Sequence, residues 1–160
     1  MDDVRIVHQR AFGRSSESVL VDALRGSPGA ISLVAAAGDR IVGHILFTRV
    51  DVDGVTLKTP AAGLAPLAVL PEHQRQAVGS QLVRAGLDAC RSLDLSIIVV
   101  LGHPEYYPKF GFVPASTKGL EYEHAVPSDA FMVLELQPGA LAQARGVVRY
   151  HPEFSARVRE

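Results

Sequence analysis

One amphipathic helix pattern lies between two short apolar runs, and this arrangement constrains the fold more than any other part of the chain. The pattern covers residues 79–93, where apolar side chains share one face and charged side chains lie off it. The preceding run, residues 64–70, and the following run, residues 97–101, are typical of buried strands. Pro66 predicts an irregularity in the first run, because proline cannot donate a ladder hydrogen bond. The segment therefore predicts strands combined with a covering helix.

The other patterns of the chain add helices and strands to this segment. Two segments near the N-terminus have helical periodicity, and four further segments are rich in strand-forming residues. The predicted helices are residues 2–12 and 15–25, and the predicted strands are residues 31–37, 40–51, 130–136 and 147–150. Gly38-Asp39 is a turn signal that joins the first two strands as a hairpin. The chain is thus predicted to be a single α/β domain with a mixed sheet.

The composition excludes several classes of protein. The chain has 160 residues, with 16 Lys and Arg against 17 Asp and Glu, so it lacks the basic field that gathers nucleic acid. Its single cysteine, Cys90, excludes an intramolecular disulfide and argues against a cysteine-based zinc site. No apolar run approaches the roughly 20 residues that span a bilayer, and the acidic N-terminus is unlike a signal peptide. We therefore expect a cytoplasmic protein that binds no nucleic acid, membrane or metal.

The C-terminal part of the chain is separated from the rest by a break in the pattern. Gln-Pro-Gly at residues 137–139 interrupts the strand signal, and a short helical stretch and a charged end follow. We expect residues 1–136 to form the functional domain and residues 137–160 to form an extension packed on it.

The segment between the first apolar run and the helix has the composition of an anion-binding loop. The first turn of a helix carries N–H groups without internal partners and a partial positive charge, which favours phosphate. Small residues at positions 77, 79 and 80 let a bulky pyrophosphate approach the backbone, and Arg75 adds a charge. The segment has neither the Gly-Lys-Ser/Thr of a Walker loop nor a G-x-G-x-x-G. An ordinary helix start explains Gly79 and Ser80 equally well at this level.

Residues 74–80 read Q-R-Q-A-V-G-S, which resembles the Q/R-x-x-G-x-G/A pyrophosphate loop of the GNAT superfamily of acyl-CoA-dependent N-acyltransferases. The resemblance implies acetyl-CoA as co-substrate, with its diphosphate along the loop and its pantetheine arm along a splayed strand. The implied binding residues are Leu67, Ala68 and Val69 in the strand and Gln74, Arg75, Gln76, Ala77, Val78, Gly79 and Ser80 in the loop. Ala77 departs from the pattern, which has glycine there. Alanine keeps the amide donor, so binding is expected to survive if the local φ is negative and to weaken if it is positive.

A second motif, residues 102–112, reads G-H-P-E-Y-Y-P-K-F-G-F and resembles the family's Tyr-x-x-x-Gly-Phe segment. It is most similar to a bacterial subgroup often described as YhbS-like. Tyr107 falls on the tyrosine of the pattern, which implies that it donates a proton to the departing thiolate of CoA; on spacing alone, a packed core aromatic is the simpler reading. The resemblance covers about residues 1–136. It implies a mostly antiparallel central sheet with a splayed strand, flanked by helices, although the family's first strand is absent from this pattern.

The resemblance implies an N-acetyltransferase in which an amine attacks acetyl-CoA directly in a ternary complex. The alternative is a non-catalytic acyl-CoA-binding sensor or partner subunit with the same fold. The acceptor is expected to be a small-molecule or peptide amine, and a backbone N–H near Val69 is the expected oxyanion donor. Three candidates for the base, Glu72, His103 and Glu105, flank the motifs and are not separable from sequence. Cys90 lies on the core face of its helix and is expected to be inert.

The absent first strand predicts an exposed sheet edge at residues 31–37. Bare edges invite pairing, so we expect this edge to be covered. Residues 137–160 are one candidate for the cover, and a second copy of the chain, which would make a homodimer, is the other.

Overall fold

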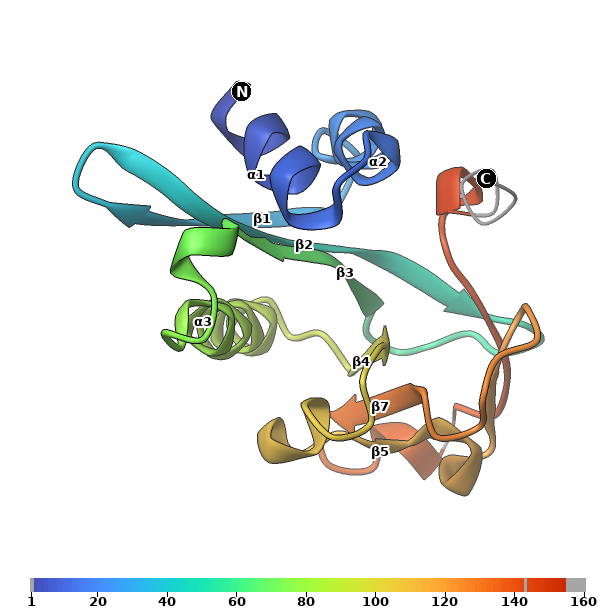
Figure 1. Cartoon of the computed structure of the whole chain (residues 1–160). Coiled ribbons are helices and arrows are strands. Elements are labelled where there is room, and N and C mark those ends of the chain that lie inside the picture. The colour runs from blue at the N-terminus through green and yellow to red at the C-terminus, as the bar shows by residue number, and fades with distance from the viewer. Residues whose placement is uncertain (1, 143, 155–160) are drawn as a thin grey trace. The chain divides into compact units, whose positions relative to one another are not determined.

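The chain divides into two compact units that share two strands and a helix. The computed structural model describes residues 2–142 and 144–154. Of these residues, the first unit contains 2–48, 65–89 and 152–154, and the second contains 49–64, 90–142 and 144–151. Figure 1 shows the succession of helices and strands along the chain.

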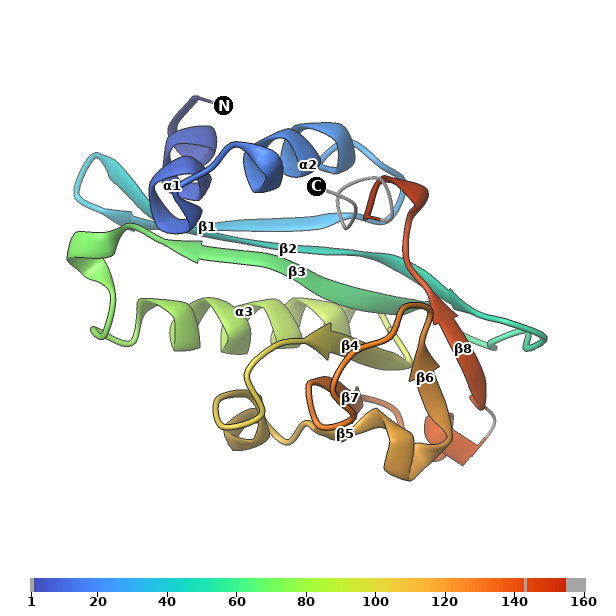
Figure 2. The same cartoon turned by 45° about the vertical axis from the view of Figure 1, so that its right-hand side comes forward.

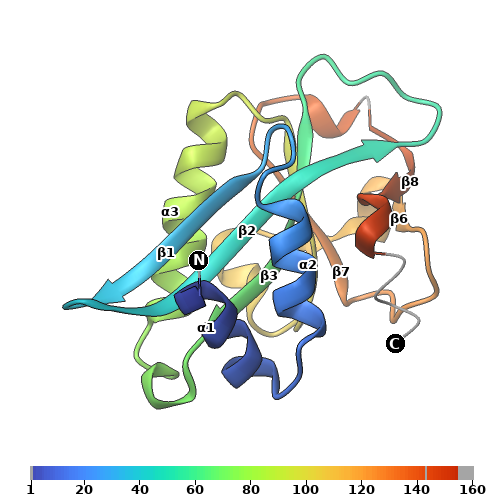
Figure 3. The same ribbon diagram turned by 90° about the horizontal axis from the view of Figure 1, so that it is seen from above.

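The first unit combines a β-hairpin with helices on both of its faces. The elements are α1 (Asp2–Phe12), α2 (Ser16–Leu24), β1 (Ile31–Ala37), β2 (Arg40–Val52), β3 (Ala61–Val69), η1 (Pro71–His73) and α3 (Val78–Ser92), the last of which, with β2 and β3, continues into the second unit. Strands β1 and β2 pair antiparallel from Ile31–Phe47 to Ala37–Arg40. Helices α1 and α2 cover one face of this hairpin and α3 the other (Figures 1 and 2), and the view from above shows α1 and α2 lying over the strands (Figure 3).

Two glycines bring α3 and β2 into close contact. A Cβ built on Gly43 of β2 would lie 3.0 Å from Leu82 Cδ1 and 3.2 Å from Val78 Cγ1. A Cβ built on Gly86 of α3 would overlap the ring of Phe47. Because the two elements meet at these positions without a side chain between them, the start of α3 is held firmly against the hairpin.

The second unit is a set of short strands around the buried strand β4. Its further elements are β4 (Ile97–Leu101), η2 (Tyr107–Phe110), β5 (Val113–Pro114), η3 (Ala115–Lys118), β6 (Leu120–Tyr122), β7 (Phe131–Glu135), η4 (Ala140–Ala142) and β8 (Gly146–Arg149). Strand β4 pairs parallel with β3 and antiparallel with β7, which in turn pairs with β5. Strand β8 pairs antiparallel with the end of β2 and parallel with β6.

The structure confirms the predicted mixed α/β sheet flanked by helices, and each predicted strand and helix is present. The irregularity predicted at Pro66 is a cis Ala65–Pro66 peptide bond, which follows the parallel pairs that β3 makes with β4 from Ala62 to Leu64. No described helix is long and apolar enough to cross a membrane.

Among the described residues, no strand of the C-terminal extension pairs with the sheet edge at β1. Cover by residues 155–160 lies outside the described residues. Strand β8 pairs with β2 and β6, and β1 pairs with β2 alone among the strands of residues 2–142 and 144–154. Cover by a second chain stays a prediction, as does the boundary between residues 1–136 and 137–160.

Candidate active site

The predicted phosphate loop lies in the first unit and has an alternating backbone conformation. Gln74 is extended, with φ −71° and ψ 156°, whereas Arg75 and Ala77 have φ values of 64° and 66° in the left-handed region. All four residues from Gln74 to Ala77 are exposed. Left-handed residues within a tight turn direct successive N–H groups toward one side and create an anion-binding concavity.

The backbone N–H groups of this loop are available for a ligand. Among the turn and loop bonds of the described residues, Arg75, Gln76 and Ala77 donate to no backbone carbonyl. Gln81 N–H donates to the Ala77 oxygen at 3.0 Å, and the N–H groups of Val78 and Gly79 precede this bond at the start of α3. The first turn contains no acidic residue that would repel an anion.

The two glutamine side chains of the loop brace it from within. Gln74 Nε2 donates to the Val69 oxygen at 3.0 Å, and Gln76 Nε2 donates to the Glu72 oxygen at 3.3 Å. These bonds turn both amides back toward the chain. Gln76 would therefore contact a phosphate through its backbone N–H, whereas Gln74 N–H already donates to the Pro71 oxygen at 3.3 Å. Arg75 is the loop residue whose charge can add to the contact.

Ala77 has the positive φ on which the sequence prediction depended. A left-handed conformation costs a residue with a Cβ about 1–2 kcal/mol, a cost that glycine avoids. Alanine keeps the amide donor, and the rest of the loop holds it in the conformation that the family pattern assigns to glycine. The departure from the pattern therefore carries a cost in stability while the N–H group stays in place.

The predicted pantetheine strand continues directly into this loop. Ala68 is buried in a cluster with Val7, Val42 and Leu70, whereas Leu67 and Val69 are half-buried. Leu70 N–H donates to the Val42 oxygen at 2.8 Å, which ties the end of the strand to β2. Because the Ala68 side chain is in the core, this residue can contact a ligand only through its backbone.

Glu72, one of the three base candidates, is an exposed ion-pair partner of two arginines. Arg10 binds it with both terminal nitrogens, at 2.7 and 2.8 Å, and Arg40 adds a third bond at 2.9 Å. The hydrogen bonds from Arg10 are the main cause that lowers the pKa of Glu72 to about 2. A carboxylate held in this way is a weak proton acceptor, so the structure removes Glu72 from the three base candidates.

Tyr107 lies in the second unit, at the start of η2. A Cβ built on Gly102 would overlap its ring, so the phenol packs directly on the backbone that follows β4. Tyr106 and Phe112 contact the ring edge-on at centroid distances of 5.0 and 5.7 Å. Burial, with a smaller effect from Tyr106, raises the pKa of Tyr107 to about 12. The phenol is thus uncharged over the physiological range and is a weaker acid than the ordinary tyrosine assumed from sequence.

The other two base candidates, His103 and Glu105, have exposed side chains in the turn before Tyr107. The His103 carbonyl accepts the N–H groups of Tyr106 and Tyr107 at 3.1 and 3.4 Å. Cys90, by contrast, is fully buried as predicted, and burial raises its pKa to about 12.

Sequence patterns missed one polar pair in the second unit. His124 Nε2 lies 3.4 Å from Glu123 Oε1, and the Glu123 side chain is only 7% exposed. The sequence carries no signal for this pair, because a Glu-His dipeptide after a short strand is also typical of a solvated turn.

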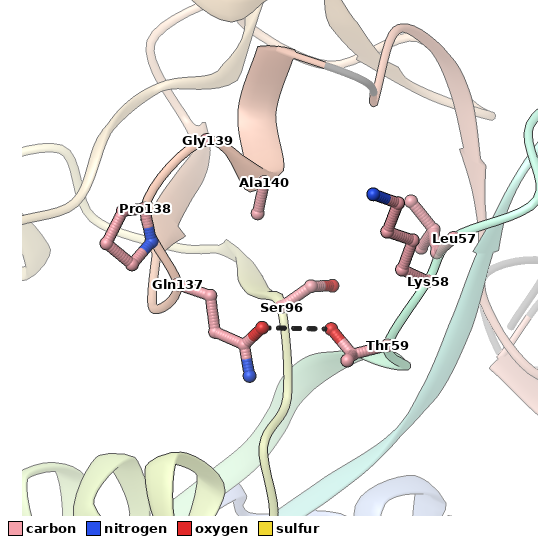
Figure 4. A pocket seen from close by; sticks show the side chains of 8 residues that line it. All are labelled: Leu57, Lys58, Thr59, Ser96, Gln137, Pro138, Gly139 and Ala140. Carbon is pink, nitrogen blue, oxygen red and sulfur yellow. Dashed lines mark hydrogen bonds between the residues drawn. The ribbon is translucent and has the colours of Figure 1, made fainter.

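A separate pocket of about 190 Å³ lies in the second unit (Figure 4). Lys58, Thr59, Ser96 and Gln137 contribute to its wall, and Thr59 Oγ1 donates to Gln137 Oε1 at 3.5 Å. None of the predicted site residues lines it, so it is not the candidate active site.

Comparison with known proteins finds acetyltransferases that are similar to this chain. Residues 1–112 match the sequence model of the acetyltransferase (GNAT) family. The uncharacterized N-acetyltransferase YjhQ of Escherichia coli K12 is 41% identical over 131 residues, which are 79% of this chain and 72% of that protein. The crystal structure of E. coli YhbS in complex with CoA has a TM-score of 0.88 at 33% identity, covering 96% of this chain and 86% of that one. A Brucella melitensis GNAT acetyltransferase in complex with acetyl-CoA has a TM-score of 0.75 at 32% identity, covering 96% and 90%.

Proposed function

The chain belongs to the GNAT family of acetyltransferases, and from this premise we propose that it transfers the acetyl group of acetyl-CoA to an amine. The acceptor is a small-molecule or peptide amine that attacks the thioester directly in a ternary complex. The observation that carries the proposal is the loop of residues 74–80, whose N–H groups and left-handed residues form an anion cradle at the start of α3. We also propose a cytoplasmic location.

The residues present fit the diphosphate and pantetheine of acetyl-CoA. The N–H groups from Gln76 to Ser80 would hold the diphosphate, with the Arg75 guanidinium as an additional contact. The backbone of Leu67 to Val69 would hold the pantetheine arm. The crystal structures of YhbS and of the Brucella relative contain CoA and acetyl-CoA, which supports this assignment.

Tyr107 would donate a hydrogen bond to the departing sulfur, and its proton would shift toward the sulfur as negative charge develops there. Complete transfer from a phenol with a pKa of about 12 to a thiolate with a pKa of about 8.5 is unfavourable by itself. A phenolate formed with such a pKa would readily recover a proton from the alkylamine nitrogen, whose pKa is about 10.4 at most. The high pKa thus favours the return of Tyr107 to its protonated state in each turnover.

The test combines binding with a screen for transfer. Calorimetric titration with acetyl-CoA measures the binding, and a panel of primary amines is assayed by release of CoA thiol, with the products confirmed by mass spectrometry. We expect binding and transfer to at least one amine, and we expect Tyr107→Phe to slow transfer with little loss of binding. Binding without transfer to any amine would instead support the acyl-CoA-binding sensor. Failure to bind acetyl-CoA would overturn the proposal.

A further inference from the structure

A carboxylate and an imidazole adjoin each other in the loop that connects β6 to β7. His124 Nε2 lies 3.4 Å from Glu123 Oε1. The two side chains differ strongly in burial, because Glu123 is 7% exposed and His124 is 37% exposed. The carboxylate is therefore inside the second unit, while the imidazole can reach a molecule that approaches from solvent.

The carboxylate is fixed on its other side by the strand next to β6. Tyr150 N–H donates to Glu123 Oε2 at 3.3 Å from the residue that follows β8. Tyr122, which precedes Glu123, pairs with Val148 of β8. Arg149 is also close enough to interact electrostatically with Glu123, but its guanidinium is bonded to Asp53 at 2.8 Å. The Glu123 carboxylate is thus held by a backbone N–H group that follows the sheet.

Aromatic residues connect this pair with the neighbourhood of Tyr107 inside the same unit. The Tyr122 ring contacts His124 at 5.5 Å and Tyr150 at 5.6 Å between centroids. Tyr150 packs on Gly63 of β3, where a Cβ would overlap its ring. Tyr107 is near enough to Tyr150 to contribute to its raised pKa. The imidazole thus contacts Tyr122 and Glu123 on its own segment, and Tyr150 and Arg149 lie on the other side of Glu123.

This arrangement has the requirements of an oriented base. A carboxylate next to one ring nitrogen fixes the tautomer with the proton on that nitrogen, which leaves the lone pair on the other. Here the proton would reside on Nε2 and the lone pair on Nδ1. An acceptor amine reaches the enzyme mostly as an ammonium ion, because its pKa is about 10.4, and it must lose a proton before it can attack a thioester.

We propose that His124 is the base that removes this proton and that Glu123 positions the His124 ring; the inference rests on the proposed acetyltransferase function. His124 Nδ1 takes one proton from the ammonium and later releases it to solvent. The free amine forms the C–N bond to the acetyl carbon, and the C–S bond breaks with its electron pair on sulfur. Tyr107 gives its proton to the sulfur and regains one from the attacking nitrogen. The products are the acetylated amine, CoA thiol and one proton.

The experiment compares pH profiles of kcat/KM for variants, with the amine that the wild-type protein acetylates fastest from a panel of ethanolamine, tyramine, spermidine and a peptide with a free N-terminus. We expect His124→Gln to lower kcat about 100-fold and to abolish the acidic limb of the profile, with the calorimetric affinity for acetyl-CoA unchanged. Glu123→Gln keeps an oxygen acceptor for Tyr150 N–H, so it should fold; we expect it to lower kcat about tenfold and to displace the limb. Glu121→Gln, an exposed carboxylate on β6, is the matched control.

The outcomes separate this inference from the proposed function. If His124→Gln retains kcat and the acidic limb, the role of His124 is overturned while the proposed acetyltransferase function stands. If instead His103→Gln loses the limb, the base is His103. An equal loss in Glu121→Gln would overturn the positioning role of Glu123. A wild-type protein that transfers to none of the four amines would overturn the proposed function and this inference together.

Discussion

Two buried histidines in the first unit predict a loss of stability in mildly acidic solution. His8 on α1 and His44 on β2 are both fully buried, and His8 Nε2 lies 2.8 Å from His44 Nδ1. His44 Nε2 bonds the Ser32 hydroxyl at 2.7 Å, and His8 Nδ1 has no hydrogen-bond partner in the described part of the chain. Burial is the main cause that lowers the pKa of His8 to about 4 and that of His44 to about 3. A proton on either ring would place a charge between helix and sheet.

The direction of the effect follows from the depressed pKa values. The unfolded chain binds protons on both histidines near pH 6.5, whereas the folded chain does so only near pH 4 and 3. The stabilisation is therefore complete above pH 6.5 and is lost as the pH falls toward these folded values. From pH 7 to pH 5, the titration of each histidine should lower the free energy of unfolding by about 2 kcal/mol, and both together should lower it by about 4 kcal/mol. The lowered pKa of Glu72, about 2, acts only below the ordinary carboxylate range and does not contribute in this window.

Urea unfolding at pH 7, 6 and 5 measures this loss. The double variant His8→Gln/His44→Gln removes both titrating rings, so its stability at pH 7 falls but its dependence on pH between 7 and 5 should nearly disappear. His103→Gln, which replaces an exposed histidine, is the matched control and should retain the wild-type slope. A wild-type loss below about 1 kcal/mol, or a double variant with the wild-type slope, would refute the reasoning.

Substitutions at three positions test the phosphate loop and the packing of Tyr107. Gly79→Val places a branched side chain where the backbone must approach phosphate, so calorimetry should show acetyl-CoA affinity at least about tenfold weaker, or about 1.4 kcal/mol, with a smaller loss for Gly79→Ala. Ala77→Gly removes a left-handed alanine, so we expect the midpoint temperature of thermal unfolding to rise slightly and the acetyl-CoA affinity to be retained. Tenfold weaker binding would contradict this. Gly102→Ala would displace the Tyr107 ring from the backbone on which it packs. We expect it to lower stability by about 1–3 kcal/mol and to slow transfer more than it weakens binding. Gly26→Ala, with no atom within 4 Å of its added Cβ, is the control for Gly102.

The helices and strands were predictable because apolar residues recur along the chain with the period of a helix or of a strand. The helix predicted at residues 79–93 is Val78–Ser92, and the strand predicted at residues 97–101 has those same ends. The conformation of the phosphate loop was not predictable in this way. Arg75 and Ala77 are left-handed although neither is glycine, and bonds from the Gln74 and Gln76 side chains to chain carbonyls brace the loop. Single-residue preferences oppose this conformation, so the sequence left the φ of Ala77 open and gave no signal for a positive φ at Arg75.

Two glutamates show why a catalytic base could not be chosen from sequence. Glu72 lies beside the phosphate motif and was an attractive candidate, but its carboxylate is bonded by Arg10 and Arg40, which are distant in the chain. Glu123 lies beside no motif, yet Tyr150 N–H from 27 residues later and its own burial hold it next to His124. Proton affinity depends on partners and burial, which differ between these identical side chains because of tertiary contacts alone. A motif therefore predicts where the cofactor binds, whereas the group that deprotonates the acceptor has to be sought among charged side chains that the fold brings together.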